Sequence, residues 1–327
     1  MLASDAFLDF IHVGVPRAGS AWLRAALEEH PEVRLADRSP GEHGRVDLDS
    51  ELVALDDPAG LERYRGRFAG AEPYRMLGDI VPGAARDPLA AVRLARRFPH
   101  LKILAFLRDP LDLLTSLHGA AFAEGRVREP FEQALRQHPE WLERVLYHRQ
   151  LQPFFDHFAP EQVCVVLYDR FFADERRHLP HLWRFLEVDD AFKPSILGYA
   201  VTAPGVRESP APRLRDLFAR RAPRTTGDGA CDWTRRYKGD FPSPVARATR
   251  QTAHEVTEAT RQRIAEAIAY DLARLESDLG LDLAHWRTTP PPAGFDHGPT
   301  VPVSTGNVIH LATAAASLHR RRSAARA

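Results

Sequence analysis

The chain has 327 residues, of which 44% are hydrophobic, so it can bury one large α/β core, although its length alone also allows two domains. Its 44 basic and 44 acidic residues balance, which excludes an overall field that would favour nucleic acid or a membrane surface as partner. Its two cysteines make neither a disulfide framework nor a metal site, and the sequence shows no signal peptide or membrane-length apolar segment, so a cytoplasmic protein is expected.

The first feature along the chain is a strand, a glycine-bearing turn and a helix in succession. The apolar run 7–13 predicts the strand, and apolar residues fall at helical spacing within 20–29. The N–H groups of such a turn point inward, and the first amides of the helix have no internal partners. Ser20 is expected to cap this helix and to offer its hydroxyl to a phosphate-type oxygen. The stretch therefore predicts an anion-binding cradle.

The turn has the glycine spacing of a P-loop but a different cation. Gly14 and Gly19 bracket four residues, yet Ser20 stands where a nucleotide triphosphatase has lysine, and the cation is Arg17, inside the turn. The run Gly-Val-Pro-Arg-Ala-Gly-Ser resembles the 5′-phosphosulfate loop of the sulfotransferases that depend on PAPS (3′-phosphoadenosine-5′-phosphosulfate). It is most similar to the tyrosylprotein branch of that family, in which arginine is the usual loop cation. The resemblance implies that PAPS binds here, through Pro16, Arg17, Ala18, Gly19, Ser20, Ala21 and Trp22.

Strand-like and helix-like segments alternate through the rest of the chain. A long polar loop is expected over 36–57, and the segments that follow it are predicted as strands over 74–80, 101–107 and 163–168 and as helices over 88–98, most of 122–158 and 174–186. The run 101–107 is almost unbroken Leu, Ile and Phe, as in the middle of a parallel sheet. The alternation predicts an α/β fold, with a central parallel sheet flanked by helices and a P-loop-like nucleotide-binding architecture.

A second motif closes the strand 101–107. Arg108, Pro110 and Ser116 match the family pattern Arg-x-Pro-x-x-Arg-Ala-x-Ser, whereas Leu113 replaces its second arginine. In that family the first arginine and the serine bind the 3′-phosphate, and the resemblance implies this role for Arg108 and Ser116. An arginine fork suits a phosphate, and ligands of open α/β sheets bind at the carboxyl ends of the strands. This loop is therefore expected beside the first one.

A third basic segment lies far along the chain. The run 235–241 resembles the basic glycine loop with which the family closes its cofactor site, although a solvated charge run is the alternative. The resemblance implies cofactor contacts from Arg235, Arg236, Lys238 and Gly239. An amphipathic helix is predicted over 257–279, and the segment after it resembles the end of bacterial sulfotransferase domains. One sulfotransferase-like domain is therefore predicted over residues 1–287, followed by a proline-rich linker and a basic, alanine-rich tail over 288–327.

The resemblance implies sulfuryl transfer from PAPS to a hydroxyl or an amine. An acceptor atom attacks sulfur in line, and 3′-phosphoadenosine-5′-phosphate leaves. Arg17 is expected to neutralise the leaving phosphate, and the loop donors take the place of a metal, so no metal is expected. The acceptor's proton needs a base, for which Glu42 is favoured, followed by Asp79 and then Asp37. The family's lysine near the strand 74–80 is absent.

Two other functional classes stay open on the sequence. A P-loop kinase or nucleotide triphosphatase would depend on magnesium, and a PAPS-binding protein without catalytic activity would bind the nucleotide without turnover. The acceptor is expected to be a small molecule rather than nucleic acid or a membrane component. The sequence leaves the oligomeric state open.

Overall fold

The computed structural model describes residues 7–37, 52, 54–71, 74–197 and 256–287. Its centre is a five-stranded sheet in the order β2-β3-β1-β4-β5, in which all neighbouring strands are parallel. The strands are β1 (Phe10–Gly14), β2 (Val33–Leu35), β3 (Met76–Ile80), β4 (Lys102–Leu107) and β5 (Val163–Leu167). This sheet confirms the predicted α/β fold with a central parallel sheet.

The registers bring the carboxyl ends of the three central strands to one edge of the sheet. His12 of β1 pairs with Ile80 of β3, and Gly14 pairs with Ala105 of β4. All of β4 after its first residue is buried, as expected for an apolar strand that is covered on both faces. The turns that follow β1, β3 and β4 therefore lie next to one another.

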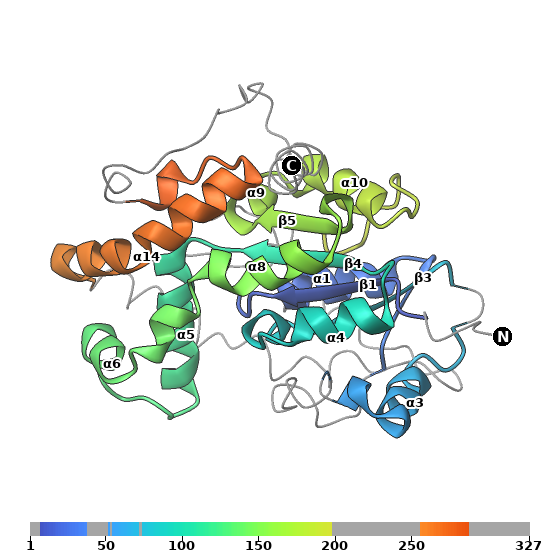
Figure 1. Ribbon diagram of the computed structural model, residues 1–327. Helices are drawn as coiled ribbons and strands as arrows, with labels where there is room; N and C mark the ends of the chain where they lie inside the picture. The colour runs from blue at the N-terminus through green and yellow to red at the C-terminus, as the bar shows by residue number, and fades with distance from the viewer. Residues whose placement is uncertain (1–6, 38–51, 53, 72–73, 198–255, 288–327) are drawn as a thin grey trace, which may run out of the picture.

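Helices connect and cover the strands (Figure 1). The α-helices are α1 (Ser20–Glu29), α3 (Pro58–Gly66), α4 (Ala90–Arg97), α5 (Pro110–Ala123), α6 (Phe131–Gln137), α7 (Glu140–Glu143), α8 (Tyr147–His157), α9 (Tyr168–Ala173), α10 (Glu175–Phe185) and α14 (Glu258–Leu279). Short 3-10 helices are η1 (Ala54–Asp56), η2 (Ala84–Arg86), η3 (Pro160–Gln162) and η4 (Ala284–Trp286). The predicted long helical region after α5 thus consists of three separate helices.

The two faces of the sheet are covered by different helices. On one face α4 contacts α8, and α8 contacts α14 (Figure 1). On the other face Trp22 of α1 lies with its ring 5.3 Å from that of Phe171 in α9. His30, at the end of α1, lies 5.0 Å from the ring of Trp183 in α10. Both ends of α1 are therefore held by buried aromatic contacts.

Candidate functional site

The loop between β1 and α1 has the backbone of an anion cradle. Gly19 is the N-cap of α1 with φ of 93°, and Arg17 also has a positive φ of 72°. A Cβ atom on Gly19 would lie 2.9 Å from Cε2 of Phe172, so only glycine fits. The N-cap of α1 is Gly19 and its first helical residue is Ser20, so the expected Ser20 cap is wrong. The first amides of α1 are left facing the loop.

Arg17, within this loop, contacts both Ser116 and Arg108 of the second motif. Nε of Arg17 donates to Oγ of Ser116 in α5 at 3.1 Å, and Nη1 of Arg108 donates to the carbonyl oxygen of Arg17 at 3.1 Å. Arg108 is only 4% exposed, and its Nε and Nη2 atoms make no hydrogen bond within the described residues. Asp112 is the nearby carboxylate, with Oδ2 3.8 Å from Nη2. The structure therefore brings the loop cation and the second motif together around a buried guanidinium with unused donors.

Tyr168 lies beside Arg108 but belongs to neither of the two motifs found in the sequence. It begins α9 directly after β5, and its ring centroid lies 5.0 Å from Cζ of Arg108. The side chain is 2% exposed, and its hydroxyl has no hydrogen-bond partner within the described residues. Burial raises the pKa of Tyr168 to about 12, so the phenol is neutral. Its position at the carboxyl end of a strand was the available signal, because ligands bind at that edge.

Trp22 is the second buried polar donor near the loop. It is 1% exposed, and its Nε1 atom makes no hydrogen bond within the described part of the chain. The rings of Phe171 and Phe172 each lie 5.3 Å away, so the indole is fixed by edge-on contacts. Trp22 is therefore firmly positioned in α1, three residues after Gly19.

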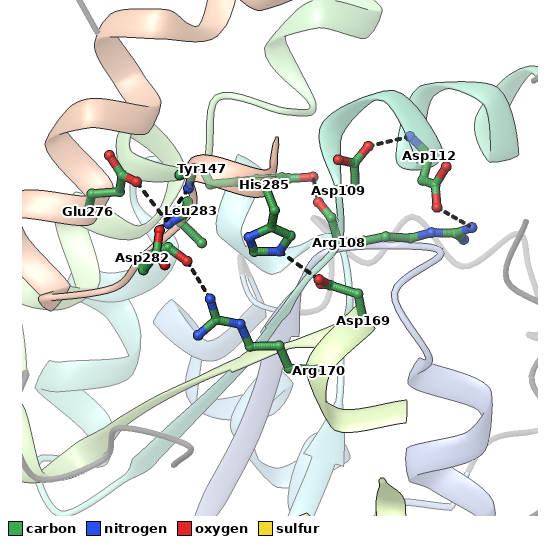
Figure 2. Close-up of polar contacts among 11 residues, drawn as sticks. Arg108, Asp109, Asp112, Tyr147, Asp169, Arg170, Glu276, Asp282, Leu283 and His285 are labelled. Carbon is green, nitrogen blue, oxygen red and sulfur yellow. Dashed lines mark hydrogen bonds and ion pairs between the residues drawn. The ribbon is translucent and has the colours of Figure 1, made fainter. Parts of the chain in front are cut away.

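Three aspartates, Asp109, Asp112 and Asp169, lie near one another at the carboxyl ends of β4 and β5 (Figure 2). Asp109 is the N-cap of α5, and its Oδ1 atom accepts a 2.9 Å hydrogen bond from the backbone N of Asp112. Burial raises the pKa of Asp109 to about 6, and the charges of Asp112 and Asp169 add to this shift, whereas the hydrogen bond opposes it. Burial also raises the pKa of Asp112, against the effect of Arg108. The negative charge of this aspartate cluster therefore decreases as the pH falls towards 6.

The segment after α14 borders the same cluster (Figure 2). A ring nitrogen of His285 in η4 lies 2.7 Å from Oδ2 of Asp169. Nη2 of Arg170 donates to the carbonyl oxygen of Asp282 at 2.6 Å. These contacts hold residues from the end of the described chain against α9, beside the predicted phosphate-binding arginine.

The predicted base candidates have different surroundings. Asp79, in β3, is fully buried; it accepts hydrogen bonds from the Tyr64 hydroxyl at 3.1 Å and from the N of Ile80 at 2.6 Å. Nη2 of Arg24 lies 3.8 Å from its Oδ1 atom. Asp37 is exposed and pairs with Arg34 at 2.7 Å. Asp79 is thus held in a buried polar network, and Asp37 belongs to a surface ion pair.

Several predicted residues lie outside the described residues. They are the base candidate Glu42, the basic-loop residues Arg235, Arg236, Lys238 and Gly239, and the tail 288–327. Within the part of the chain that the structure describes, no group of three or more His, Cys, Asp or Glu side chains could hold a metal ion. Across the same residues, no helix is both long enough and apolar enough to pass through a membrane.

Comparison with solved structures identifies the fold. A sulfotransferase from Alicyclobacillus acidocaldarius matches with a TM-score of 0.59 and 20% sequence identity, covering 85% of this chain and 98% of that chain. The sulfotransferase domain of the curacin biosynthetic pathway has a TM-score of 0.41 at 17% identity and covers 58% of this chain and 77% of its own. The sulfotransferase domain of the Synechococcus PCC 7002 olefin synthase has a TM-score of 0.40 at 16% identity. That match covers 75% of this chain and 93% of that domain's chain. No protein-family model and no curated protein sequence matches the chain. The first similarity shows that the chain has the sulfotransferase fold.

Proposed function

We propose that this protein transfers the sulfuryl group of PAPS to a hydroxyl or an amine of an acceptor and releases 3′-phosphoadenosine-5′-phosphate (PAP). The observation that carries the proposal is the state of Arg108, which is buried beside the loop with two donor atoms that make no hydrogen bond within the described residues. A buried guanidinium with unused donors is stabilised when a phosphate accepts hydrogen bonds from them. The sulfotransferase fold supports the same proposal.

Each part of the loop has a role in this reaction. The backbone N–H groups of Ala18, Gly19 and Ser20 hold the 5′-phosphate, and they need no side-chain movement to do so. Arg17 neutralises the charge that develops on the leaving phosphate. Arg108 and Ser116 bind the 3′-phosphate, and the hydrogen bond between Ser116 and Arg17 couples the two halves of the nucleotide site.

The bond changes are those of an in-line displacement. The acceptor oxygen or nitrogen forms a bond to sulfur while the bond from sulfur to the bridging oxygen of the 5′-phosphate breaks, and PAP leaves with that electron pair. The acceptor's proton passes to a carboxylate base. Glu42 remains the favoured candidate, with Asp79 and Asp37 as alternatives; Asp79 is fully buried and already accepts hydrogen bonds from Tyr64 and Ile80.

The first test is binding of the product nucleotide. Thermal unfolding of the wild type is measured with PAP, with ADP and with ATP plus Mg²⁺, and is repeated for Arg17→Ala and Arg108→Ala. A ligand that binds only the folded state at about 100 times its Kd stabilises it by about 2.7 kcal/mol, which gives a clear shift in Tm. We expect PAP to stabilise the wild type strongly and both variants weakly.

The outcomes separate the functional classes. A wild type that ignores PAP and responds to ATP only with Mg²⁺ is a kinase or nucleotide triphosphatase, and the proposal is then wrong. The wild type is a binding protein without transferase activity if it binds PAP but forms no PAP from PAPS. This outcome must hold for every acceptor in a broad panel of alcohols, phenols and amines. PAP release that depends on both an acceptor and Arg17 supports the transferase.

A further inference from the structure

The carboxylate of Asp112 lies beside the unused donors of Arg108 (Figure 2). Its Oδ2 atom is 3.8 Å from Nη2 of Arg108, which is too far for a hydrogen bond. Nε and Nη2 of Arg108 make no hydrogen bond within the described residues, although the guanidinium is buried. The side chain of Asp112 is 32% exposed, and none of the described residues donates a hydrogen bond to its carboxylate. The two opposite charges are therefore close together, and both groups can still make hydrogen bonds.

The fold keeps this carboxylate at the proposed 3′-phosphate site. Asp112 lies in the first turn of α5, one helical turn before Ser116, so the two side chains share a face of the helix. Arg108 is fixed by its 3.1 Å hydrogen bond to the carbonyl oxygen of Arg17 and by the ring of Tyr168 at 5.0 Å. A phosphate that binds both Arg108 and Ser116 therefore lies beside Asp112.

A carboxylate beside a phosphate is unfavourable, because two negative charges repel each other strongly where water is partly excluded. The repulsion is relieved when a donor group lies between them and its proton faces the carboxylate. In PAP the 3′ and 5′ oxygens of the ribose are both esterified, so the 2′-hydroxyl is the one sugar hydroxyl that remains. It is bonded to the carbon next to that of the 3′-phosphate, on the same side of the ring. Carboxylates bind ribose 2′-hydroxyls in other nucleotide-binding folds.

We propose that Asp112 accepts a hydrogen bond from the 2′-hydroxyl of the nucleotide and thereby determines nucleotide specificity. This inference rests on the proposed function, because the 3′-phosphate must first lie on Arg108 and Ser116. A 2′-deoxynucleotide then leaves the carboxylate beside the phosphate without a donor. A 2′-phosphate places a further negative charge against Asp112. The site accordingly selects a 3′-phosphorylated ribonucleotide over both analogues.

The test compares PAP with 2′-deoxyadenosine 3′,5′-bisphosphate, which lacks only the 2′-hydroxyl. The Kd of each nucleotide is measured by isothermal titration for the wild type, Asp112→Ala and Asp112→Asn. Glu124→Gln, at an exposed carboxylate that ends the same helix, is the matched control. We expect the wild type to bind the deoxy analogue at least about tenfold more weakly, since a hydrogen bond to a charged group is lost. The ratio of the two Kd values should fall to about one in Asp112→Ala, be intermediate in Asp112→Asn and stay unchanged in Glu124→Gln.

The Kd ratio removes other effects of the substitution. Loss of a negative charge beside the phosphate should strengthen the binding of both nucleotides, and this change cancels in the ratio. The side chain of Asp109, not that of Asp112, caps α5, so we expect both variants to fold, and their Tm without ligand checks this. Adenosine 2′,5′-bisphosphate gives an independent measurement. The wild type should bind it more weakly than PAP, and Asp112→Ala should reduce that difference.

Two results would overturn the assignment of Asp112 while leaving the proposed function in place. One is that the wild type binds PAP and the deoxy analogue equally well. The other is that Asp112→Ala keeps the wild-type ratio of the two Kd values, because Asp112 then makes no contact with the 2′-hydroxyl. If PAP does not bind the wild type at all, the proposed function is wrong, and the assignment of Asp112 is overturned with it.

Discussion

The Nε atom of Arg17 donates a 3.1 Å hydrogen bond to Oγ of Ser116, a residue 99 positions further along the chain. Arg17 belongs to the loop after β1, and Ser116 belongs to the helix after β4. Arg108 completes the connection by donating to the carbonyl oxygen of Arg17. The orientation of the loop cation is therefore set by the two residues that we assign to the 3′-phosphate, and binding of that phosphate is expected to affect the position of Arg17.

Replacing Ser116 by alanine tests this coupling. The variant loses the hydrogen bond that we assign between Ser116 and the 3′-phosphate. A hydrogen bond to a charged group is worth about 1.5–3 kcal/mol, so we expect PAP affinity to fall about tenfold or more. The Tm without ligand should change little, because Arg17 can turn towards solvent. Isothermal titration with PAP measures the effect, and Thr115→Val, which removes the neighbouring hydroxyl, is the control. Equal PAP affinity in Ser116→Ala and wild type would contradict the assignment.

Arg108→Lys tests the need for a planar fork at the buried cation. Lysine keeps the charge but cannot both donate to the Arg17 carbonyl and present two further donors in one plane. We expect PAP affinity to fall about 10- to 100-fold, and that of Arg108→Ala to fall further. Titration of both variants with PAP measures these affinities. An affinity equal to that of the wild type in the lysine variant would show that PAP binding needs only the positive charge at position 108.

Tyr168→Phe separates a ligand contact from a structural one. Because the Tyr168 hydroxyl has no partner within the described residues, its removal should leave the free energy of unfolding unchanged or raise it by up to about 1 kcal/mol. PAP affinity should fall severalfold if the hydroxyl binds the nucleotide. Tyr147→Phe is the matched control, since its hydroxyl donates to the Arg108 carbonyl and its loss should destabilise the fold by about 1–3 kcal/mol. Denaturant unfolding and PAP titration of both variants distinguish the two roles. A clear loss of stability in Tyr168→Phe would show that its hydroxyl has a structural role rather than a ligand contact.

The parts of the site that the sequence predicted depend on local patterns. The strand β4 is an apolar run, and Arg108 follows it at the carboxyl edge, so the position of Arg108 beside the loop follows from parallel topology. Its contact with the loop could be expected for the same reason. The Ser20 cap was wrong because Gly19, in the left-handed region, begins the helix one residue earlier than a serine cap requires.

The parts that the sequence could not predict are long-range contacts between side chains. Asp79 of β3 accepts a hydrogen bond from Tyr64 of α3 and pairs with Arg24 of α1. These contacts join three elements, and the spacing of residues along the chain does not predict them. The contact between His285 and Asp169 likewise joins positions 116 residues apart. Such pairs are selected by packing of the whole fold, which periodicity and motif spacing do not encode.

The raised pKa of Asp109 predicts how stability changes with pH. The carboxyl has a pKa of about 6 in the folded protein and an ordinary value of 3.8, so the folded state holds its proton more tightly than the unfolded state does. This contribution to stability is complete below pH 3.8, decreases as the pH rises to about 6, and is absent above that value.

Asp109→Asn keeps an oxygen that can cap α5 but removes the buried charge. We expect this variant to be more stable than the wild type by about 1–3 kcal/mol at pH 7.5, with the difference shrinking towards pH 4.5. Urea unfolding at several pH values measures it, and Asp37→Asn, at a surface ion pair, serves as the control. A stability difference that is the same at pH 4.5 and 7.5 would show that burial does not raise the pKa of Asp109, because only a titrating group makes the difference depend on pH.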